Sequence, residues 1–140
     1  MITYPFKKLV KYPHLMPEDV KIWERFIDKN PDSFGLVSYD VRVGEGMKLP
    51  EHAEEPYASD MVYLSKKRID VVGFVGNEVW VIELKPRAGF TAIGQALGLA
   101  ELYQPEDSLP QVICPCIITD EEMPDIRGLC LKKDIIYLIA

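Results

Sequence analysis

The sequence predicts a single α/β domain in which helices pack on both faces of a mixed β-sheet. Two strand-like runs are joined by Gly76-Asn77, a pair suited to the positive φ angles of a tight β-hairpin. Further along the chain, apolar runs of strand length alternate with helix-like segments, as they do when crossover helices join strands. The chain has 140 residues, of which 48% are hydrophobic, and this content is enough for one compact core.

The N-terminal half is expected to hold one helix, one strand and a long loop. Residues 17–29 start with Pro17, place acids in the first turn and repeat apolar side chains at helical spacing. Residues 34–43 alternate and are rich in β-branched side chains, as strands are. Residues 44–59 are expected to form a loop, and a loop this long is more often functional or mobile than a simple connection.

The two hairpin strands are expected at residues 68–75 and 78–85, and the second strand ends at Pro86 because proline has no amide hydrogen. Thr91 is the candidate N-cap of the helix that follows. The later elements are a helix at 89–103, a strand at 112–118, a helix at 121–133 and a strand at 135–139. The expected element order is therefore αβββαβαβ.

Net charge limits the ways in which this protein could contact nucleic acid. The formal charge is -6 and the pI is about 4.9, whereas binding by bulk electrostatics needs an excess of Lys and Arg. Any contact with nucleic acid must therefore be local. The sequence has no apolar run that would make a signal peptide or a membrane helix, so we expect a soluble, cytoplasmic protein with no membrane partner.

The cysteines and histidines make a poor zinc set. Cys114 and Cys116 flank a proline, and Cys130, His14 and His52 stand apart in the sequence. Structural zinc sites usually pair their ligands as CxxC or HxxxH, because that spacing lets two ligands converge on one ion. We expect the three cysteines to be buried thiols of strands.

Two acids are expected to face each other across the hairpin. With Gly76-Asn77 as a two-residue turn, Val75 pairs with Glu78, and the same register places Asp70 opposite Glu83. Opposed side chains have Cβ atoms about 5 Å apart. Two carboxylates that close repel each other unless a cation lies between them or one of them takes up a proton.

The two-residue period of a strand puts Lys85 on the same face as Glu83. One or two carboxylates, with water and phosphate in the remaining positions, are how proteins hold Mg²⁺, so we expect Mg²⁺ or Mn²⁺ as the cofactor. The alternative is a solvated charge ladder. Val71, Val72 and Ile82 weigh against it, because apolar neighbours on both faces imply a covered sheet.

Arg68-Ile69-Asp70, followed by Val81-Ile82-Glu83-Leu84-Lys85, resembles the PD-(D/E)xK nuclease superfamily, whose signature is an acid and then acid-x-lysine on a hairpin. The resemblance implies a restriction-endonuclease-like fold, a metal held by the two acids and the Leu84 carbonyl, and a catalytic role for Lys85. It also implies a glutamate on the N-terminal helix, a place that Glu24 occupies. The proline of the family name is absent before Asp70.

The segment Gly94-Gln95-Ala96-Leu97, followed by Tyr103, resembles the RecB-like branch, in which a glutamine and a tyrosine on this helix line the site. That branch favours tyrosine four residues after the glutamine, where this chain has Leu99, so Gln95 is the stronger candidate. Gln95 also lies at helical spacing with Leu99 and Leu102. A polar group in an apolar stripe needs a partner, either in the site or in the core.

The basic residues that flank the hairpin acids in sequence are the candidates for phosphate contacts. The predicted nucleic-acid contacts are Lys66, Lys67, Arg68, Arg87 and Tyr103.

These patterns predict a metal-dependent nuclease, acting on DNA in the first place and on RNA in the second. Asp70, Glu83 and Lys85 are its expected catalytic residues, and Glu24 and Gln95 are expected to complete the site. One alternative is a nuclease-fold module without catalysis that works within a larger complex, which the acidic charge favours. Another is a binding domain in which the charged residues form an ion-pair network. A homodimer would give so small a domain reach over a duplex.

Overall fold

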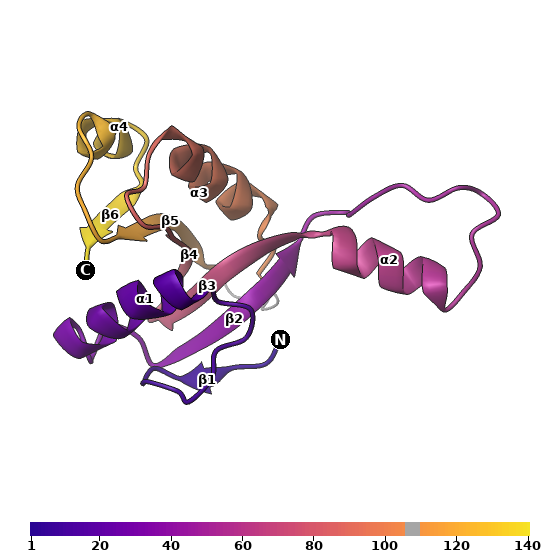
Figure 1. The fold of residues 1–140 in the computed structure, drawn as a ribbon, viewed down its shortest axis with the longest axis horizontal. Helices are drawn as coiled ribbons and strands as arrows, with labels where there is room; N and C mark the ends of the chain where they lie inside the picture. Colours follow the sequence, from indigo (N-terminus) through magenta and orange to yellow (C-terminus); the bar gives the residue numbers. More distant parts are fainter. Residues whose placement is uncertain (106–109) are drawn as a thin grey trace.

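A computed structural model describes residues 1–105 and 110–140 and shows a mixed α/β fold with a six-stranded sheet (Figure 1). The helices are α1 (Pro17–Lys29), α2 (Tyr57–Ser65), α3 (Phe90–Leu102) and α4 (Ile126–Lys132). The strands are β1 (Tyr4–Pro5), β2 (Leu36–Val43), β3 (Lys67–Val75), β4 (Glu78–Leu84), β5 (Val112–Thr119) and β6 (Ile136–Ile139).

The strands lie in the sheet in their sequence order, β1-β2-β3-β4-β5-β6. Pairing is antiparallel from β1 to β4 and parallel from β4 to β6. The change occurs where α3 joins β4 to β5, because a parallel neighbour requires a crossover connection and a helix supplies it. The predicted mixed sheet with helices is therefore confirmed.

The predicted elements are all present, and two further ones were missed. The helix at 17–29 has the predicted bounds, and the hairpin turns at Gly76-Asn77 with Val75 paired to Glu78. The short strand β1 and the helix α2 were not predicted, and α2 takes up the end of the expected loop. The predicted cap of α3 was wrong: Gly89, not Thr91, is the N-cap residue, and no side chain caps this helix. The helix predicted at 121–133 begins only at Ile126, after Asp125 with a positive φ of 68°.

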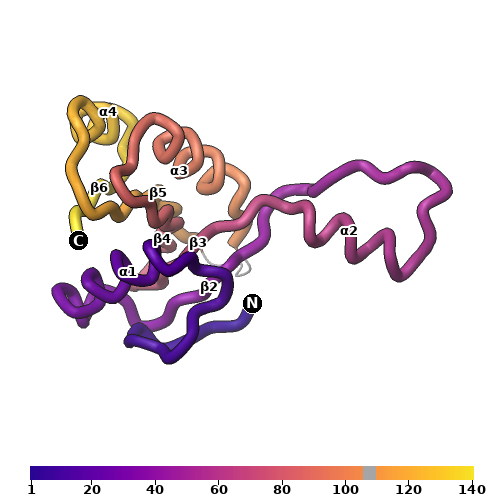
Figure 2. The backbone as a smooth tube through the Cα atoms, viewed as in Figure 1, coloured from indigo at the N-terminus to yellow at the C-terminus, as the bar shows by residue number. Residues whose placement is uncertain are grey.

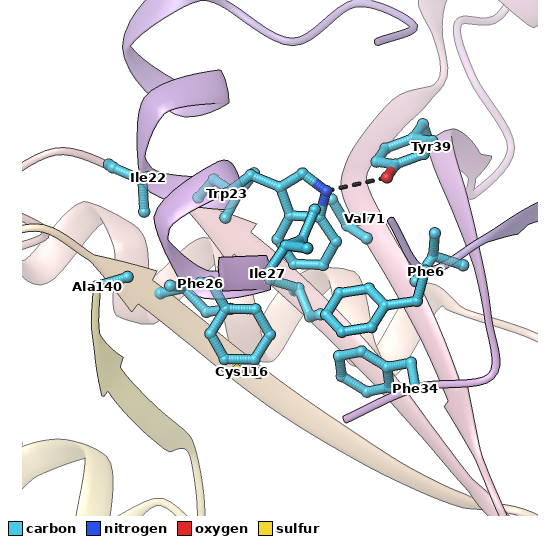
Figure 3. Packing of buried hydrophobic residues seen from close by; sticks show 14 of the residues in the cluster. Phe6, Ile22, Trp23, Phe26, Ile27, Phe34, Tyr39, Val71, Cys116 and Ala140 are labelled. Carbon is cyan, nitrogen blue, oxygen red and sulfur yellow. Dashed lines mark hydrogen bonds between the residues drawn. The ribbon is translucent and has the colours of Figure 1, made fainter. Parts of the chain in front are cut away.

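The face of the sheet that α1 covers holds an aromatic core. Trp23 is fully buried on α1, stacks on Phe26, and donates its indole N–H to the hydroxyl of Tyr39 on β2 at 2.9 Å (Figure 3). Ile82 and Leu84 of β4 join this cluster. The hydrogen bond satisfies two polar groups that would be costly to bury unpaired, so α1 is fixed on the sheet by packing and by one specific bond.

Helix α3 packs on the other side of β4. Its buried residues are Ala92, Ala96 and Leu99, and the cluster that contains Leu99 also contains Val79 and Val81 of β4. Strand β4 thus alternates between the two clusters, as a strand with both faces covered must. This double coverage makes an ionised side chain near the end of β4 costly to bury.

Residues 44–66 project from the β2–β3 end of the sheet as an arm that ends in α2 (Figure 2). Ser65 closes the arm at its base, because its hydroxyl accepts from the amide of Met47 at 2.7 Å. Arg42 of β2 donates to the carbonyl of Leu64 at 3.1 Å. Only Ala58 of α2 is buried, so the arm adds little to the core.

Two further predictions concern the thiols and the membrane. Cys114, Cys116 and Cys130 are free; Cys116 is buried in β5 as predicted, whereas Cys130 is buried in α4 and Cys114 is only partly buried. Within residues 1–105 and 110–140, no helix is long and apolar enough to cross a membrane.

We expect Gly73→Ala to destabilise the fold by about 1–3 kcal/mol, because a Cβ at this position of β3 would lie 2.7 Å from the ring of Phe34. The matched control is Gly94→Ala in α3, where a Cβ would meet no atom of the described chain within 4 Å. That change should stabilise by up to about 1 kcal/mol through helix propensity. Urea unfolding of both variants measures the difference, and equal effects would contradict the packing around Phe34.

Candidate metal centre

Asp70 and Glu83 meet where the backbone pairing of the hairpin stops. The ladder runs from Val75 and Glu78 to Val71 and Ile82, so the next pair in register is Asp70 with Glu83. At this position a side-chain hydrogen bond replaces the backbone pairing, because Oδ2 of Asp70 accepts a hydrogen bond from the amide of Leu84 at 2.9 Å. The predicted register is confirmed as far as Val71 and Ile82, the pair next to the two acids.

Glu83 is buried and Asp70 is half-buried, and burial is the largest cost of ionising either carboxyl group. Glu83 is only 9% exposed, and burial, with the charges of Asp70 and Asp19, raises its pKa to about 8. Burial also raises the pKa of Asp70 to about 6, against the hydrogen bond from Leu84, which favours the charged form. Glu83 therefore resists ionisation at neutral pH, and a cation beside it would favour its charged form.

Asp19 on α1 is a third acid of this site, and the sequence analysis missed its role. It lies in the first turn of the helix, and burial raises its pKa, while the charge of Lys85 lowers it. Its charge in turn raises the pKa values of both Asp70 and Glu83. The available signal was its place at the helix start, which we interpreted only as a favourable interaction with the helix dipole.

Glu24 was predicted to fill the place that Asp19 takes. It is half-buried one and a half turns further along α1, where its carboxylate accepts a hydrogen bond from the hydroxyl of Tyr12 at 2.9 Å. That hydroxyl accepts in turn from the amide of Leu9 at 2.9 Å. Glu24 therefore ties the N-terminal segment to α1, and Asp19 is the helix acid that acts on the hairpin pair.

Lys85 follows directly after β4 and is exposed. Its backbone amide donates to the carbonyl of Ile118 on β5 at 3.2 Å, so its main chain is held by the sheet. Its positive charge favours the ionised forms of both Glu83 and Asp19. The charges of these four side chains thus influence one another's ionisation, and Lys85 is the one that is exposed to solvent; the others are Asp19, Asp70 and Glu83.

A basic cluster borders the acids on strand β2, around Asp40. The carboxylate of Asp40 lies 3.6 Å from Nε of Arg68, 3.5 Å from Nε2 of His14 and 4.0 Å from Nη2 of Arg42. Tyr39 and Val41 pair with Val71 and Ile69, which places Asp40 across from Asp70. Arg68 lowers the pKa of Asp70 and Asp40 raises it, so this cluster is part of the electrostatic surroundings of the metal candidate.

Asp40 has a positive φ of 52°, which Asp tolerates better than most residues. The strands change faces at this level: Tyr39 and Val71 belong to the cluster under α1, whereas Val43 and Ile69 belong to the cluster under α3. The acids of β2 and β3 therefore lie where regular alternation breaks. Such a break was not visible in the alternating pattern of the sequence.

Gln95 and Tyr103 lie differently from what the helix pattern predicted. Gln95 is exposed on α3, so it is not the buried polar group that would need a core partner. Tyr103 is 6% exposed and packs in the cluster of Val72, Val81 and Leu99. Tyr103 also lines a cleft between β2 and the base of the arm, and its role as a nucleic-acid contact stays a prediction.

The remaining basic candidates are spread over two parts of the molecule. Lys66 ends α2 and Lys67 begins β3, both at the base of the arm, close in sequence to Arg68. Arg87 lies at the other side, past the end of β4, where its amide donates to Asp120 at 2.8 Å and its guanidinium pairs with Glu121 at 3.5 Å. Arg87 thus has acidic partners already.

The described residues do not form a complete set of protein ligands for a metal ion. In the described part of the chain no three His, Cys, Asp or Glu side chains stand close enough together to hold an ion. The predicted set consists of two carboxylates, and the backbone of Leu84 is hydrogen-bonded to one of them. An ion held by so few protein groups would have to keep several waters, as Mg²⁺ does.

We expect Glu83→Gln to stabilise the metal-free protein at pH 8 by about 2 kcal/mol. The pKa of the Glu83 side chain rises from 4.5 to about 8 on folding. Between these pH values only the unfolded chain loses the proton, so the free energy of unfolding falls as the pH rises. The amide of glutamine does not titrate, so the variant does not lose this stability. Thermal unfolding in EDTA from pH 5 to pH 8 should show the advantage growing with pH, and the exposed control Glu51→Gln should show none. An advantage that stays constant with pH would contradict the burial of an ionisable Glu83.

Comparisons of this chain with protein-family models, curated proteins and solved structures found no match.

Proposed function

We propose that this protein hydrolyses phosphodiester bonds of nucleic acid, DNA in the first place, with Mg²⁺ or Mn²⁺ held between Asp70 and Glu83. The observation that carries the proposal is that the half-buried Asp70 and the buried Glu83 lie at opposed positions of the hairpin, with Lys85 just after the end of β4. Buried like charges are costly without purpose, and strongly perturbed acids gather at functional sites.

The fold supports this proposal. The antiparallel strands β2, β3 and β4 are followed by the parallel strand β5, which α3 connects to β4. Helices α1 and α3 pack with β4 in two separate hydrophobic clusters. This arrangement fits the restriction-endonuclease-like fold that the resemblance of the hairpin to PD-(D/E)xK nucleases implies. Asp70 and Glu83 belong to the two strands of the hairpin, which is compatible with that resemblance.

Each residue has a role that its position allows. Asp70 and Glu83 would hold the ion, with the Leu84 carbonyl as a further oxygen ligand and Asp19 adding negative charge from α1. When bound, the ion supplies a water of lowered pKa and neutralises charge on the phosphate. Nζ of Lys85, open to solvent, would orient the attacking water or stabilise the charge that develops on the phosphate. Gln95 is exposed on α3 and could act only by reaching toward a bound strand.

A second candidate function is a nuclease-fold module that does not cleave and works within a larger complex. The observation that favours it is the net charge of -6, which opposes tight binding of nucleic acid by this chain alone. The two functions differ in one measurable property, since only the nuclease turns over a phosphodiester substrate.

We expect Lys85→Ala to reduce metal-dependent cleavage by about 10²–10⁴-fold, the usual range for a residue that transfers or positions a proton. Metal affinity should stay near that of the wild type, because the lysine serves the reaction and the acids serve the ion. Asp70→Asn should lose both cleavage and metal binding. The assay uses labelled single-stranded and duplex DNA and RNA with Mg²⁺, Mn²⁺ or EDTA, and calorimetry with Mn²⁺ measures binding.

The matched control is Lys132→Ala, an exposed lysine in the last turn of α4. It should cleave as the wild type does. Full cleavage by Lys85→Ala would overturn the role of the lysine, and Mn²⁺ binding without cleavage of any substrate would favour the non-catalytic module.

A further inference from the structure

The arm at residues 44–66 is folded but has almost no core of its own. Its helix α2 has 9 residues and buries only Ala58. Isolated helices shorter than about 12–15 residues are marginal in water, so α2 depends on packing against something else. Tyr57 and Leu64 lie two turns apart on one side of α2, and they are 67% and 66% exposed. The arm thus presents an apolar pair that its own chain leaves open to solvent.

The charge of the arm limits the kind of partner that could cover this pair. The acids of the arm are all exposed, and they outnumber its two lysines, Lys48 and Lys66; they are Glu45, Glu51, Glu54, Glu55 and Asp60. Asp60 lies between Tyr57 and Leu64 on the same side of α2. Such a surface repels a polyanion, whereas a basic surface with an exposed apolar group complements it.

The N-terminal part of the same chain carries a basic surface of this kind. Its exposed bases are Lys7, Lys8, Lys11, Lys21, Arg25 and Lys29, and the exposed acids among residues 7–29 are Glu18 and Asp28. The segment before α1 lies along the helix, because Nζ of Lys8 is 2.8 Å from Asp28. The hydroxyl of Tyr12 likewise donates to Glu24 at 2.9 Å. Val10 is fully exposed in this segment, so bases and an open apolar side chain share one surface.

The arm and the N-terminal surface of one chain are too far apart to meet. The arm extends from one end of the long axis of the molecule, and α1 lies toward the opposite end (Figure 1). The backbone trace of the arm leads away from the sheet and returns to it without passing near α1 (Figure 2). The two complementary surfaces can therefore meet only between two copies. In a two-fold dimer each contact between them is made twice.

We propose that this protein forms a two-fold dimer in which the acidic arm of each chain lies on the basic N-terminal surface of the other. The contact covers the apolar side chains of Tyr57, Leu64 and Val10 and sets Asp60 and the neighbouring acids against the bases around α1. The net charge of -6 opposes association in general, but an acidic arm facing a basic surface makes this one arrangement attractive. The proposal does not depend on the proposed function.

Sedimentation velocity over a range of protein concentrations measures this association without any substrate. We expect the wild type to form a dimer whose dissociation constant rises with added NaCl, because salt screens the opposed charges. Glu54→Lys with Asp60→Lys reverses the arm, and Lys11→Glu with Arg25→Glu reverses the N-terminal surface. Each pair of changes should raise the dissociation constant at least about tenfold, since like charges then face each other. All four side chains are exposed, so the fold should remain intact.

A mixture of the two reversed variants is the most specific measurement. Each variant carries the charge that complements the other, so the mixture should form a dimer about as tightly as the wild type does. Variants that fail to fold would not restore it. The matched control is Lys132→Glu with Lys133→Glu, two exposed lysines at the end of α4. This control changes the net charge as much as the N-terminal reversal does and should remain dimeric.

A wild type that is monomeric at every concentration would overturn the proposal and leave the arm to a different basic protein. A dimer that both reversed variants leave intact would overturn it as well, because the contact would then lie elsewhere on the molecule. So would a mixture of the reversed variants that stays monomeric. None of these readouts depends on cleavage, so the dimer and the nuclease can fail separately.

Discussion

The enclosure of Glu83 beside Asp70 is the constraint on which the rest of this site depends. At the end of a covered hairpin both carboxyl groups are costly to ionise, and burial raises the pKa of Glu83 to about 8, so Glu83 keeps its proton at neutral pH. Asp70 gains one backbone hydrogen bond from Leu84, and Glu83 gains the charge of Lys85. The apolar packing of β4 on both faces holds the strand in place despite this cost. A cation beside the two groups would offset the cost of ionising Glu83, which the apolar packing imposes.

The same constraint explains how the sheet is arranged around the acids. Near its turn the hairpin has a complete backbone ladder, whereas at the acids the Asp70 side chain bonds the Leu84 amide directly. On the neighbouring strand, Asp40 takes a positive φ, and the strand changes the cluster into which it packs. Regular pairing is thus interrupted at one level of the sheet, the level of Asp40, Asp70 and Glu83. Departures from regular geometry of this kind tend to occur at functional sites.

Local rules predicted the hairpin, its register and the two acids, because a two-residue turn fixes which residues oppose each other. They could not choose between Asp19 and Glu24, since that choice depends on which turn of α1 reaches the end of β4. Similarly, the leucines of α3 suggested a stripe that includes Gln95, whereas Ala92 and Ala96 pack on the sheet and leave Gln95 exposed. Helix α2 was missed because it buries only Ala58 and so shows little apolar periodicity.

An acidic protein that acts on nucleic acid must obtain its affinity at short range. With a net charge of -6, the field of the whole chain repels a polyanion, so diffusion is not steered toward the site. The basic residues near Asp40 act only within about a Debye length, roughly 8–10 Å at physiological salt. On the proposed function, attraction for nucleic acid is therefore weak at a distance and depends on contacts made close to the acids.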